Sequence, residues 1–429
     1  MTLDPVHYDG IARLARRIDH GASERDHRDF AETVWESFLD PLTDGDRVVL
    51  EPIESVSRHL IDVEDVALAE RPFDREHGLD AGTINPTTFR NGLVLDIAQA
   101  AMASTPTDLD LHRSRTVVAS VHSNDPTASV DDRWGRFDEG FSRSRAIQVP
   151  PLPRFAEGVV HALALYLAES EHALEHAEAV SELLILDGPL YPRGILRWND
   201  QHPDLASFLV ADQQPQSVLE NYVRLVESFV ERDVPFVGFV KNPATRVISR
   251  TVIGKGESAP WTDDTSFFTR VLERGEYVDD VEGTRWERDT DGLTYTGWFR
   301  SRGGVDAPLS VDGDALGVER KLDPVAYEVT FFVIYDPRVD LCYRVEAPYA
   351  FTRDDDRRAR LTRQLLSDVA ISAGPPAVVE KADELARISA SEKHSLRETF
   401  EARFETTRER DYDDHRWGGT AEQTTGFER

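Results

Sequence analysis

The sequence predicts an α/β protein in which one mixed β-sheet is flanked by helices. Three observations support this fold class. Residues 1–70 have helical periodicity, residues 78–122 contain three short strands, and residues 155–241 alternate helix and strand. A meander gives antiparallel strands, and a strand-helix-strand crossover gives parallel ones. The expected sheet is therefore antiparallel on one side and parallel on the other.

The first element is an N-terminal helical segment, residues 1–70. Ile11, Leu14 and Ile18 share one face of a helix over residues 8–18. A second helix is expected over residues 24–39 and a third over residues 56–70. The intervening Asp-Gly-Asp at positions 44–46 is typical of a turn.

A three-stranded meander follows the helical segment. Its strands are expected at residues 78–83, 92–98 and 115–122, each apolar or β-branched and bounded by turn residues. Residues 123–150 are polar and rich in Asp, Ser and Arg, so they are expected to form a long loop or insertion.

The next part predicts a crossover unit. A helix over residues 155–177 leads into the apolar run 182–187, and a helix over residues 216–232 leads into 234–241. A continuous apolar run is typical of a strand that is buried on both faces. Because strand, helix and strand follow one another, the two strands should be parallel.

The last third is more varied. Residues 255–320 are expected to be an insertion of irregular strands and loops, and residues 327–335 with 341–346 a hairpin. Helices are expected over residues 357–370 and 377–388. Residues 396–429 are expected to form a flexible tail. The order of elements from the meander onward is that of a ribonuclease H-like fold, which by itself says little about function.

The charge of the chain is strongly acidic. The formal net charge is -30, yet 40% of residues are hydrophobic, so the composition is that of a folded protein and not of a disordered one. Such a surface repels itself at ordinary salt and is screened in concentrated salt. A salt-adapted cytoplasm is the simplest interpretation, and an acidic surface for a basic partner is the alternative.

Several classes of protein are disfavoured. Cys342 is the single cysteine, so an intramolecular disulfide and a cysteine zinc cluster are excluded. No signal-peptide pattern and no run of eighteen apolar residues occur, so a cytoplasmic location without a membrane span is expected. The chain has no Walker lysine motif, no Gly-x-Gly-x-x-Gly and no Gly-x-Ser-x-Gly.

Two aspartates suggest metal chemistry. Asp80 ends an apolar stretch and precedes Ala81-Gly82-Thr83, and Asp187 closes the buried run and precedes a glycine. Metal-dependent phosphodiester cleavage needs carboxylates from distant chain positions, with small neighbours that let a nucleic acid approach. Each aspartate also fits a simple turn. A buried, unpaired Asp187 would be costly, which favours a metal or a basic partner.

Other candidates are weaker. Lys241, one of five lysines, ends the second crossover strand and is either a phosphate contact or a surface lysine. The helix before Asp187 is acidic, and Glu171 and Glu175 share a face. His172 and His176 have the i, i+4 spacing of zinc ligands, but no third ligand is evident.

Four segments together resemble the NurA family of nucleases. They are Leu79-Asp80-Ala81-Gly82-Thr83, the run Leu-Ile-Leu-Asp-Gly-Pro-Leu at 184–190, residues 237–242 with Lys241, and the helix at 375–388. The resemblance covers roughly residues 75–390 and implies a domain over residues 71–395 that includes the insertions near 123–150 and 255–320.

The resemblance also implies function and site residues. A NurA protein is a 5′-to-3′ exonuclease and single-strand endonuclease, usually uses Mn²⁺, with Mg²⁺ as an alternative, forms a homodimer, and works with the HerA hexameric ATPase in resecting double-strand breaks. Asp80 and Asp187 carry over as metal ligands. Glu169 fits the family's upstream glutamate, with Glu171 second. Asp383 stands where the family commonly has a histidine.

Two readings therefore remain. The first is a metal-dependent deoxyribonuclease that acts on single-stranded DNA and duplex ends. The second is a non-catalytic DNA-processing subunit that binds and regulates a translocase ATPase, and the aspartate at position 383 is its main support. A structural protein of a salt-adapted cytoplasm would explain the charge but not the aspartates at two strand ends.

Overall fold

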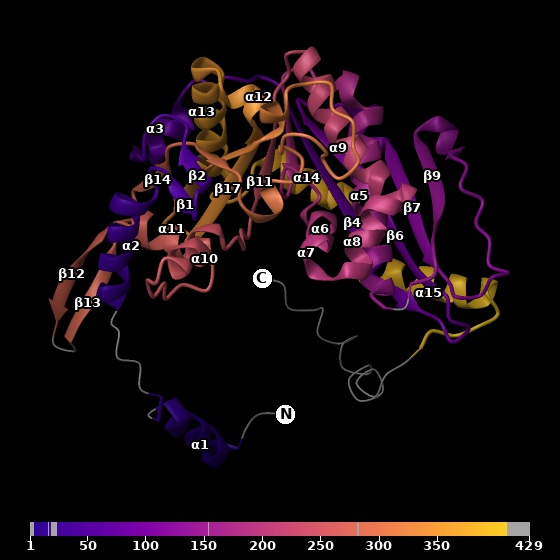
Figure 1. The fold of residues 1–429 in the computed structure, drawn as a ribbon, viewed down its shortest axis with the longest axis horizontal. Helices are drawn as coiled ribbons and strands as arrows, with labels where there is room; N and C mark the ends of the chain where they lie inside the picture. Colours follow the sequence, from indigo (N-terminus) through magenta and orange to yellow (C-terminus); the bar gives the residue numbers. More distant parts are fainter. Residues whose placement is uncertain (1–3, 16, 19–23, 153, 281–282, 410–429) are drawn as a thin grey trace.

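A mixed β-sheet of 15 strands runs through the part of the chain that the computed structural model describes, which is residues 4–15, 17–18, 24–152, 154–280 and 283–409 (Figure 1). Five strands form its centre, in the spatial order β7-β6-β4-β10-β11. Their bounds are β4 Glu76–Thr83, β6 Val94–Thr105, β7 Arg115–His122, β10 Leu183–Asp187 and β11 Phe236–Val240.

The pairing within these five strands confirms the predicted meander and crossover. The β4–β6 and β6–β7 pairs are antiparallel, and the β4–β10 and β10–β11 pairs are parallel. Helix α9 (Gln213–Glu231) connects β10 to β11, and α5 (Ala156–Glu175) precedes β10. The hairpin is also confirmed: β16 (Val329–Asp336) pairs with β17 (Leu341–Pro348), and β17 continues the sheet beyond β11.

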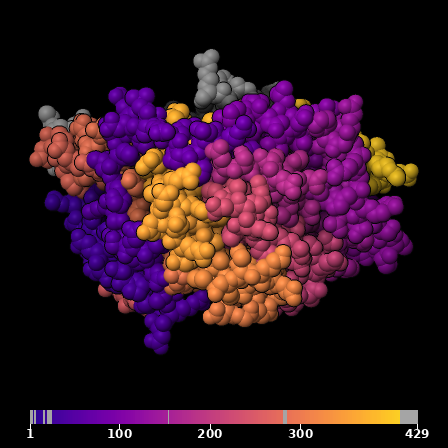
Figure 2. Space-filling view, turned by 90° about the horizontal axis from the view of Figure 1, so that it is seen from above, coloured from indigo at the N-terminus to yellow at the C-terminus, as the bar shows by residue number. Residues whose placement is uncertain are grey.

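Helices cover both faces of the centre. Leu184 and Leu186 of β10 pack with α5 and α9, whereas Leu183 and Ile185 pack with α13 (Asp355–Ser372) and α14 (Ala377–Ala386). Because successive strand residues point to opposite faces, a strand covered on both sides has to be apolar throughout. Figure 2 shows the gold surface from the later part of the chain between the indigo N-terminal residues and the magenta middle.

The N-terminal segment is only partly helical. Helices α1 (Pro5–Ala15) and α2 (Glu24–Phe38) are present, and α1 lies apart from the sheet (Figure 1). The predicted helix over residues 56–70 is wrong. Residues Arg58–Asp62 form β3, which pairs with β14, and only Val63–Leu68 are helical, as α3. Asp62 caps α3 by accepting the N–H groups of Glu64 and Asp65, so the helix cannot begin earlier.

The predicted loop over residues 123–150 contains two strands. Strand β9 (Ser142–Val149) pairs in parallel with β7, and β8 (Gly135–Phe137) lies at the edge of the sheet. Only Ile147 and Val149 of β9 are fully buried apolar residues, so the strand has little hydrophobic pattern. Its pairing with β7 supplies the backbone hydrogen bonds that the sequence did not reveal.

Within residues 255–320, two strands join the main sheet, and the rest is helical, irregular or part of a separate ribbon. Strand β14 (Gly292–Thr296) pairs with β3 and β16, and β15 (Phe299–Ser301) pairs with β2 and β16. Strands β12 (Gly275–Asp280) and β13 (Gly283–Arg288) form a separate two-stranded ribbon. Helix α11 (Asp264–Leu272) was not predicted; it packs with α2 on a third apolar cluster that includes Trp35 and Phe267.

The C-terminal part extends beyond the expected end of structure. Helix α15 (Ala390–Arg403) begins with a capping box between Ser389 and Glu392, so the flexible tail predicted from residue 396 is wrong up to residue 403. Residues 410–429 of that prediction lie outside the described residues. Cys342 is buried, as expected. None of the described helices combines the length and apolar character needed to cross a bilayer.

Short elements complete the fold. The strands are β1 Leu42–Asp44, β2 Arg47–Pro52 and β5 Thr87–Thr88. The α-helices are α4 Leu109–Arg113, α6 Arg193–Leu196, α7 Trp198–Gln201, α8 Pro203–Ala211, α10 Val247–Gly254 and α12 Tyr349–Thr352. Single 3₁₀ turns lie at Asp138–Gly140, Ala177–Ala179, Gly304–Asp306 and Pro324–Tyr327.

Candidate metal centre

Asp80 and Asp187 lie side by side on neighbouring parallel strands. Leu79 of β4 is opposite Leu186 of β10, so the next residue of each strand is an aspartate. Both leucines pack in the core beneath α5 and α9. Since side chains alternate along a strand, the two aspartates belong to the other face, which α13 and α14 cover. Two separate turn aspartates would have no reason to share a register and a face.

Helix α14 lies directly against β4 on this face. A Cβ on Gly78 would stand 2.2 Å from the carbonyl oxygen of Val378, and one on Gly82 would stand 2.5 Å from that of Ala386. The absence of a side chain at both positions lets the helix backbone approach. The sequence suggested that Gly82 makes room for a nucleic acid, but its free space is filled by α14. The helix brings Asp383 toward Asp80.

Glu169 approaches the pair from the other face of the sheet. It lies on α5, is partly buried, and is hydrogen-bonded to the Tyr222 hydroxyl of α9. Glu171 lies two residues further along α5 in a different environment. Its carboxylate accepts hydrogen bonds from Arg143 and from Asn221, both at 3.3 Å. The structure therefore brings Glu169, and not Glu171, toward the two aspartates.

The carboxylates interact strongly with one another. Burial and the charge of Asp187 raise the pKa of Asp80 to about 7, and Asp383 adds to this effect. Burial and the charges of Asp80 and Asp187 raise the pKa of Glu169 to about 8. Burial also raises the pKa of Asp187. Like charges gathered in a partly desolvated place disfavour their own ionisation, and a cation placed among them would relieve this.

Two basic side chains partly compensate the cluster. Lys241 Nζ donates to Asp187 Oδ2 at 2.7 Å, and Arg387 donates to Asp383 Oδ2 at 2.5 Å from one helical turn away. Lys241 is therefore paired with a carboxylate of the cluster and is not a free surface lysine. Among the residues described, no three His, Cys, Asp or Glu side chains are close enough together to hold one ion in this arrangement.

The histidines of α5 lie elsewhere. His161 Nδ1 is 2.7 Å from Asp96 Oδ2, and His172 Nδ1 is 3.0 Å from Thr116 Oγ1. Neither partner belongs to the carboxylate cluster. Sequence reasoning missed Tyr222 and Arg387 as neighbours of the site. Arg387 could have been found from its i+4 spacing to Asp383, whereas nothing local in the sequence distinguishes Tyr222.

A protein-family comparison bears on this arrangement. The model of the NurA domain matches residues 75–388, which contain all four carboxylates and Lys241. The chain belongs to the NurA family. A search among curated proteins gave no match.

Solved NurA structures are similar at low identity. The NurA nuclease from Sulfolobus solfataricus is 13% identical with a TM-score of 0.48, and the match covers 94% of this chain and 98% of that one. A second NurA structure is 10% identical with a TM-score of 0.43, covering 95% and 99%. A NurA structure bound to dAMP and manganese is 10% identical with a TM-score of 0.41, covering 80% and 90%.

A buried network fixes the loop that follows Asp187 in this NurA domain. Arg193 donates to Asp306 at 2.8 Å and lies 2.5 Å from Glu346, and Arg344 contacts the same two acids at 2.8 and 2.6 Å. Glu346 also accepts the backbone N–H of Leu190 at 3.0 Å. All four charged side chains are at least nine-tenths buried, so the network is rigid and locally neutral.

Replacing Glu346 by alanine is expected to lower the free energy of unfolding by about 3–5 kcal/mol, because two buried arginines lose a partner. Chemical denaturation monitored by tryptophan fluorescence would measure this. The matched control is Glu51→Ala, which also removes a carboxylate that joins two arginines, but at a side chain that is 27% exposed. A loss of about 1 kcal/mol or less is expected there. Equal losses would contradict a special role for the buried network.

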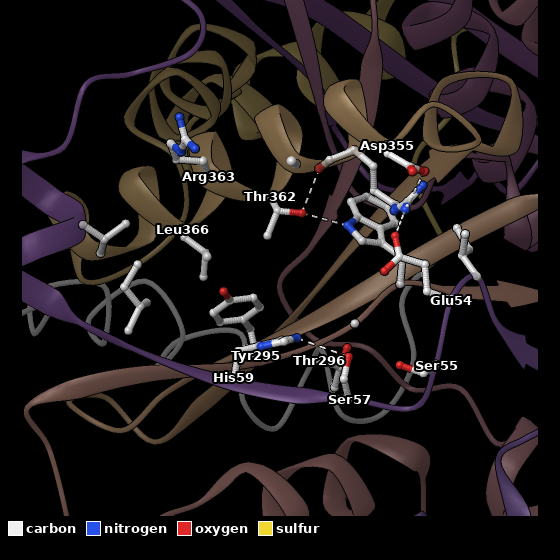
Figure 3. Close-up of a pocket in the computed structure, with 17 residues that line it drawn as sticks. Glu54, Ser55, Ser57, His59, Tyr295, Thr296, Asp355, Thr362, Arg363 and Leu366 are labelled. Atoms are coloured by element: carbon white, nitrogen blue, oxygen red, sulfur yellow. Dashed lines mark hydrogen bonds and ion pairs between the residues drawn. The ribbon is translucent and has the colours of Figure 1, made fainter.

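The pocket drawn in Figure 3 is distinct from the carboxylate cluster. It lies between β3, β14 and α13, where Trp298 donates to Thr362 at 2.8 Å and His59 stacks on Tyr295. None of Asp80, Glu169, Asp187, Lys241 and Asp383 lines it.

Proposed function

We propose that this NurA-family protein is a metal-dependent DNA nuclease whose ion is held by Asp80, Asp187, Glu169 and Asp383. One observation supports this most strongly. Four carboxylates from β4, α5, β10 and α14 gather around Asp80, and burial together with repulsion from neighbouring carboxylates raises the pKa of Asp80 to about 7 and that of Glu169 to about 8. Clusters of carboxylates with perturbed pKa values are typical of functional sites.

The donor set fits a hard divalent cation. Carboxylate oxygens are the ligands that Mn²⁺ and Mg²⁺ prefer. We propose Mn²⁺, the ion named for two NurA structures, with Mg²⁺ as the alternative. When bound, such an ion polarises the scissile phosphate and makes bound water more acidic. The aspartate at position 383, where the family commonly has a histidine, adds a further oxygen donor.

The remaining residues position these carboxylates. Tyr222 orients Glu169 through its hydroxyl, and the loop network around Glu346 fixes the backbone after Asp187. Lys241 holds one oxygen of Asp187. We propose that Lys241 turns to a phosphate oxygen when DNA binds, and that Arg387 releases Asp383 when the ion binds.

Further properties are proposed from the family. The first is a ribonuclease H-like fold. It is supported by the spatial order β7-β6-β4-β10-β11, which is 3-2-1-4-5 when these five strands are numbered along the chain. The second is 5′-to-3′ exonuclease and single-strand endonuclease activity. The proposed properties also include a homodimer and action in double-strand break resection with a HerA-type hexameric ATPase. The net charge of -30 supports activity in concentrated salt.

The central test is a DNA degradation assay in concentrated salt with Mn²⁺, with Mg²⁺, and with a chelator. Degradation of single-stranded DNA is expected with Mn²⁺ and its loss with the chelator. A non-catalytic subunit is the second candidate, and the pairing of Asp383 with Arg387 favours it. Absence of cleavage under every metal condition, together with stimulation of a translocase ATPase, would establish that alternative.

A pair of variants on one helix tests the choice of glutamate. Glu169→Gln is expected to reduce Mn²⁺-dependent cleavage by about 100-fold or more, because a site that binds metal through charge loses one ligand. Glu171→Gln, two residues along α5, is the matched control and should retain most activity, since Glu171 contacts Arg143 and Asn221. The opposite ranking would show that the wrong glutamate has been assigned.

Metal binding is expected to release protons near neutral pH. With pKa values of about 7 and 8, Asp80 and Glu169 together keep about one proton or more at pH 7, which a cation must displace. Apparent Mn²⁺ affinity should therefore rise between about pH 6 and 9. Calorimetric titration in two buffers of different ionisation enthalpy measures the released protons. Glu169→Gln should release fewer, and equal heats for the wild type in both buffers would contradict the assignment.

A further inference from the structure

A second charged site lies on β7 and β9, two strands from Asp80. It is a pocket lined by side chains from β7, β8, β9 and the end of α5, among them Arg115, Thr116, Arg136, Arg143, Glu175 and His176. We call it the Arg115 pocket. Asp80 is opposite Ala101 of β6, and Ala100 is opposite Thr116 of β7, so Arg115 is level with Asp80 across the sheet. At ~4.8 Å per strand the two backbones are roughly 10 Å apart.

Two of the three arginines have acidic partners. Arg143 reaches Glu171 at 3.3 Å and Glu175 at 3.2 Å, its Nε donates to Thr116, and it stacks on Trp134. Arg136 donates to Glu175 at 2.8 Å. These contacts fix the wall of the pocket and leave its charge nearly balanced on that side.

Arg115 is different. Its Nη1 donates to the backbone carbonyls of His112 and Ser114 at 2.7 and 2.8 Å, and no carboxylate of the described residues forms an ion pair with it. The guanidinium is partly buried, and burial alone lowers the pKa of Arg115. Carbonyls compensate a cation only in part, and an arginine has three further N–H donors. Within the described part of the chain, the pocket therefore holds one positive charge without an acidic partner.

The other titratable groups of the pocket do not cancel this charge. Burial lowers the pKa of His176, so the imidazole is neutral at pH 7. Glu139 is directed toward Arg113, whose guanidinium is 3.9 Å away, and its side chain is 83% exposed. The carboxylates of Glu171 and Glu175 already form ion pairs with Arg143, and Glu175 also pairs with Arg136.

The rim of the pocket has an unusual backbone. Asp138, Glu139 and Gly140 have consecutive positive φ angles of 53°, 55° and 99°. Such a conformation is costly for non-glycine residues and is kept only where the surroundings hold it. Arg113 holds this turn, since its Nε and Nη2 donate to the two oxygens of Asp138 at 3.1 and 2.6 Å. Arg113 thus holds the turn that contributes Glu139 and Gly140 to the lining of the pocket.

We propose that the Arg115 pocket binds a phosphate group, with Arg115 as the principal donor and Arg136 at the rim. Arginine forks match the oxygens of a phosphate. The hydroxyls of Ser114 and Thr116 are already hydrogen-bonded, to the Asp110 carbonyl and to His172 and Arg143, so the arginines are the donors offered to the phosphate. The phosphate could be free or part of a nucleotide. It could equally belong to the backbone of a DNA strand that extends from the carboxylate centre, and this second source rests on the proposed nuclease function.

The first test uses inorganic phosphate with metal removed by a chelator. Phosphate is expected to raise the melting temperature of the wild type more than chloride at equal ionic strength, and Arg115→Gln should remove this difference. The matched control is Arg224→Gln on α9, an arginine whose side chain is 60% exposed and paired with Glu220. It should behave as the wild type. Equal stabilisation of Arg115→Gln, or no excess over chloride in the wild type, would overturn the proposal.

Arg136→Gln provides a second variant if Arg115→Gln does not fold. Arg136 is exposed at the rim, so its removal should weaken phosphate binding about three-fold or more without unfolding the protein. Unchanged binding in this variant would also count against the site.

A second arm separates the two phosphate sources. Binding of an oligonucleotide without metal is measured against salt concentration for the wild type and Arg115→Gln. If the pocket holds a DNA phosphate, the variant should bind more weakly and its salt dependence should fall by about one unit of slope. If only free phosphate is affected, the pocket serves a free anion. Because no cleavage is measured, failure of this proposal is distinguishable from failure of the nuclease function.

Discussion

Asp80→Asn and Asp187→Asn are each expected to lower Mn²⁺-dependent DNA degradation by about 1000-fold or more. A bound ion contributes several kcal/mol of transition-state stabilisation, and each 1.36 kcal/mol corresponds to about ten-fold in rate. Asparagine keeps the shape of the side chain but removes the charge that attracts the cation. Initial rates on a labelled single-stranded oligonucleotide, with Mn²⁺ varied to saturation, measure the loss. Variant rates close to the wild type would rule out both residues as ligands.

The same variants should remain folded. A carboxyl whose pKa is raised in the folded state contributes stability that is present below its unfolded pKa and is lost as the pH rises through the folded value. For Asp80 this window runs from about pH 4 to about pH 7. Metal-free Asp80→Asn should therefore melt at the same temperature as the wild type or higher at pH 8. Asp200→Asn, at an exposed aspartate of α7, is the activity control and should cleave normally.

Gly82→Ala is expected to cost about 1–3 kcal/mol of stability and most of the nuclease activity. The new methyl group would stand 2.5 Å from the carbonyl oxygen of Ala386, so α14 has to move away from β4. Asp383 lies one turn earlier on α14 and would move with it. Denaturant unfolding measures the first effect and the DNA assay the second.

The matched control is Gly158→Ala. Gly158 lies in α5, and a Cβ there would meet nothing within 4 Å. Alanine is favoured over glycine inside a helix, so a gain of up to about 1 kcal/mol and normal activity are expected. If Gly82→Ala were equally well tolerated, the close approach of α14 to β4 would not be needed for function.

The centre of the fold could be predicted because its elements are locally consistent. The apolar run before Asp187 and the amphipathic pattern of α9 each predict their own structure from a short stretch of sequence. The outer strands could not be predicted in this way. Arg58–Asp62 becomes a strand only because β14 lies beside it, more than 200 residues later in the chain. Strand β9 likewise depends on β7, since only two of its side chains are fully buried apolar residues.

The site residues likewise fall into those that local sequence indicates and those that depend on distant parts of the chain. The sequence pointed to Asp80 and Asp187 as strand-end residues with small neighbours. The structure places them side by side, with Asp187 at the end of β10, but Asp80 lies inside β4, three residues before its end, because pairing with β6 continues to Thr83. Glu169 and Asp383 came from the resemblance to the family, because an acidic helix of an acidic protein offers many equivalent glutamates. The pairing of Lys241 with Asp187 depends on tertiary structure, so no local sequence pattern predicts it. The reason for Gly82 was misjudged for the same cause, as its neighbour is 304 residues away.

The contact of α14 with β4 has a consequence for the growing chain on the ribosome. Asp80 and its strand are synthesised early, whereas Asp383 follows 303 residues later. At typical rates of about 5–20 residues per second, roughly 15–60 seconds separate the two. During that interval the nascent chain has β4 without the helix that completes its acidic face. In the proposed nuclease, the full set of carboxylates is therefore present only after residue 383 has been synthesised, so metal-dependent cleavage cannot begin before that point.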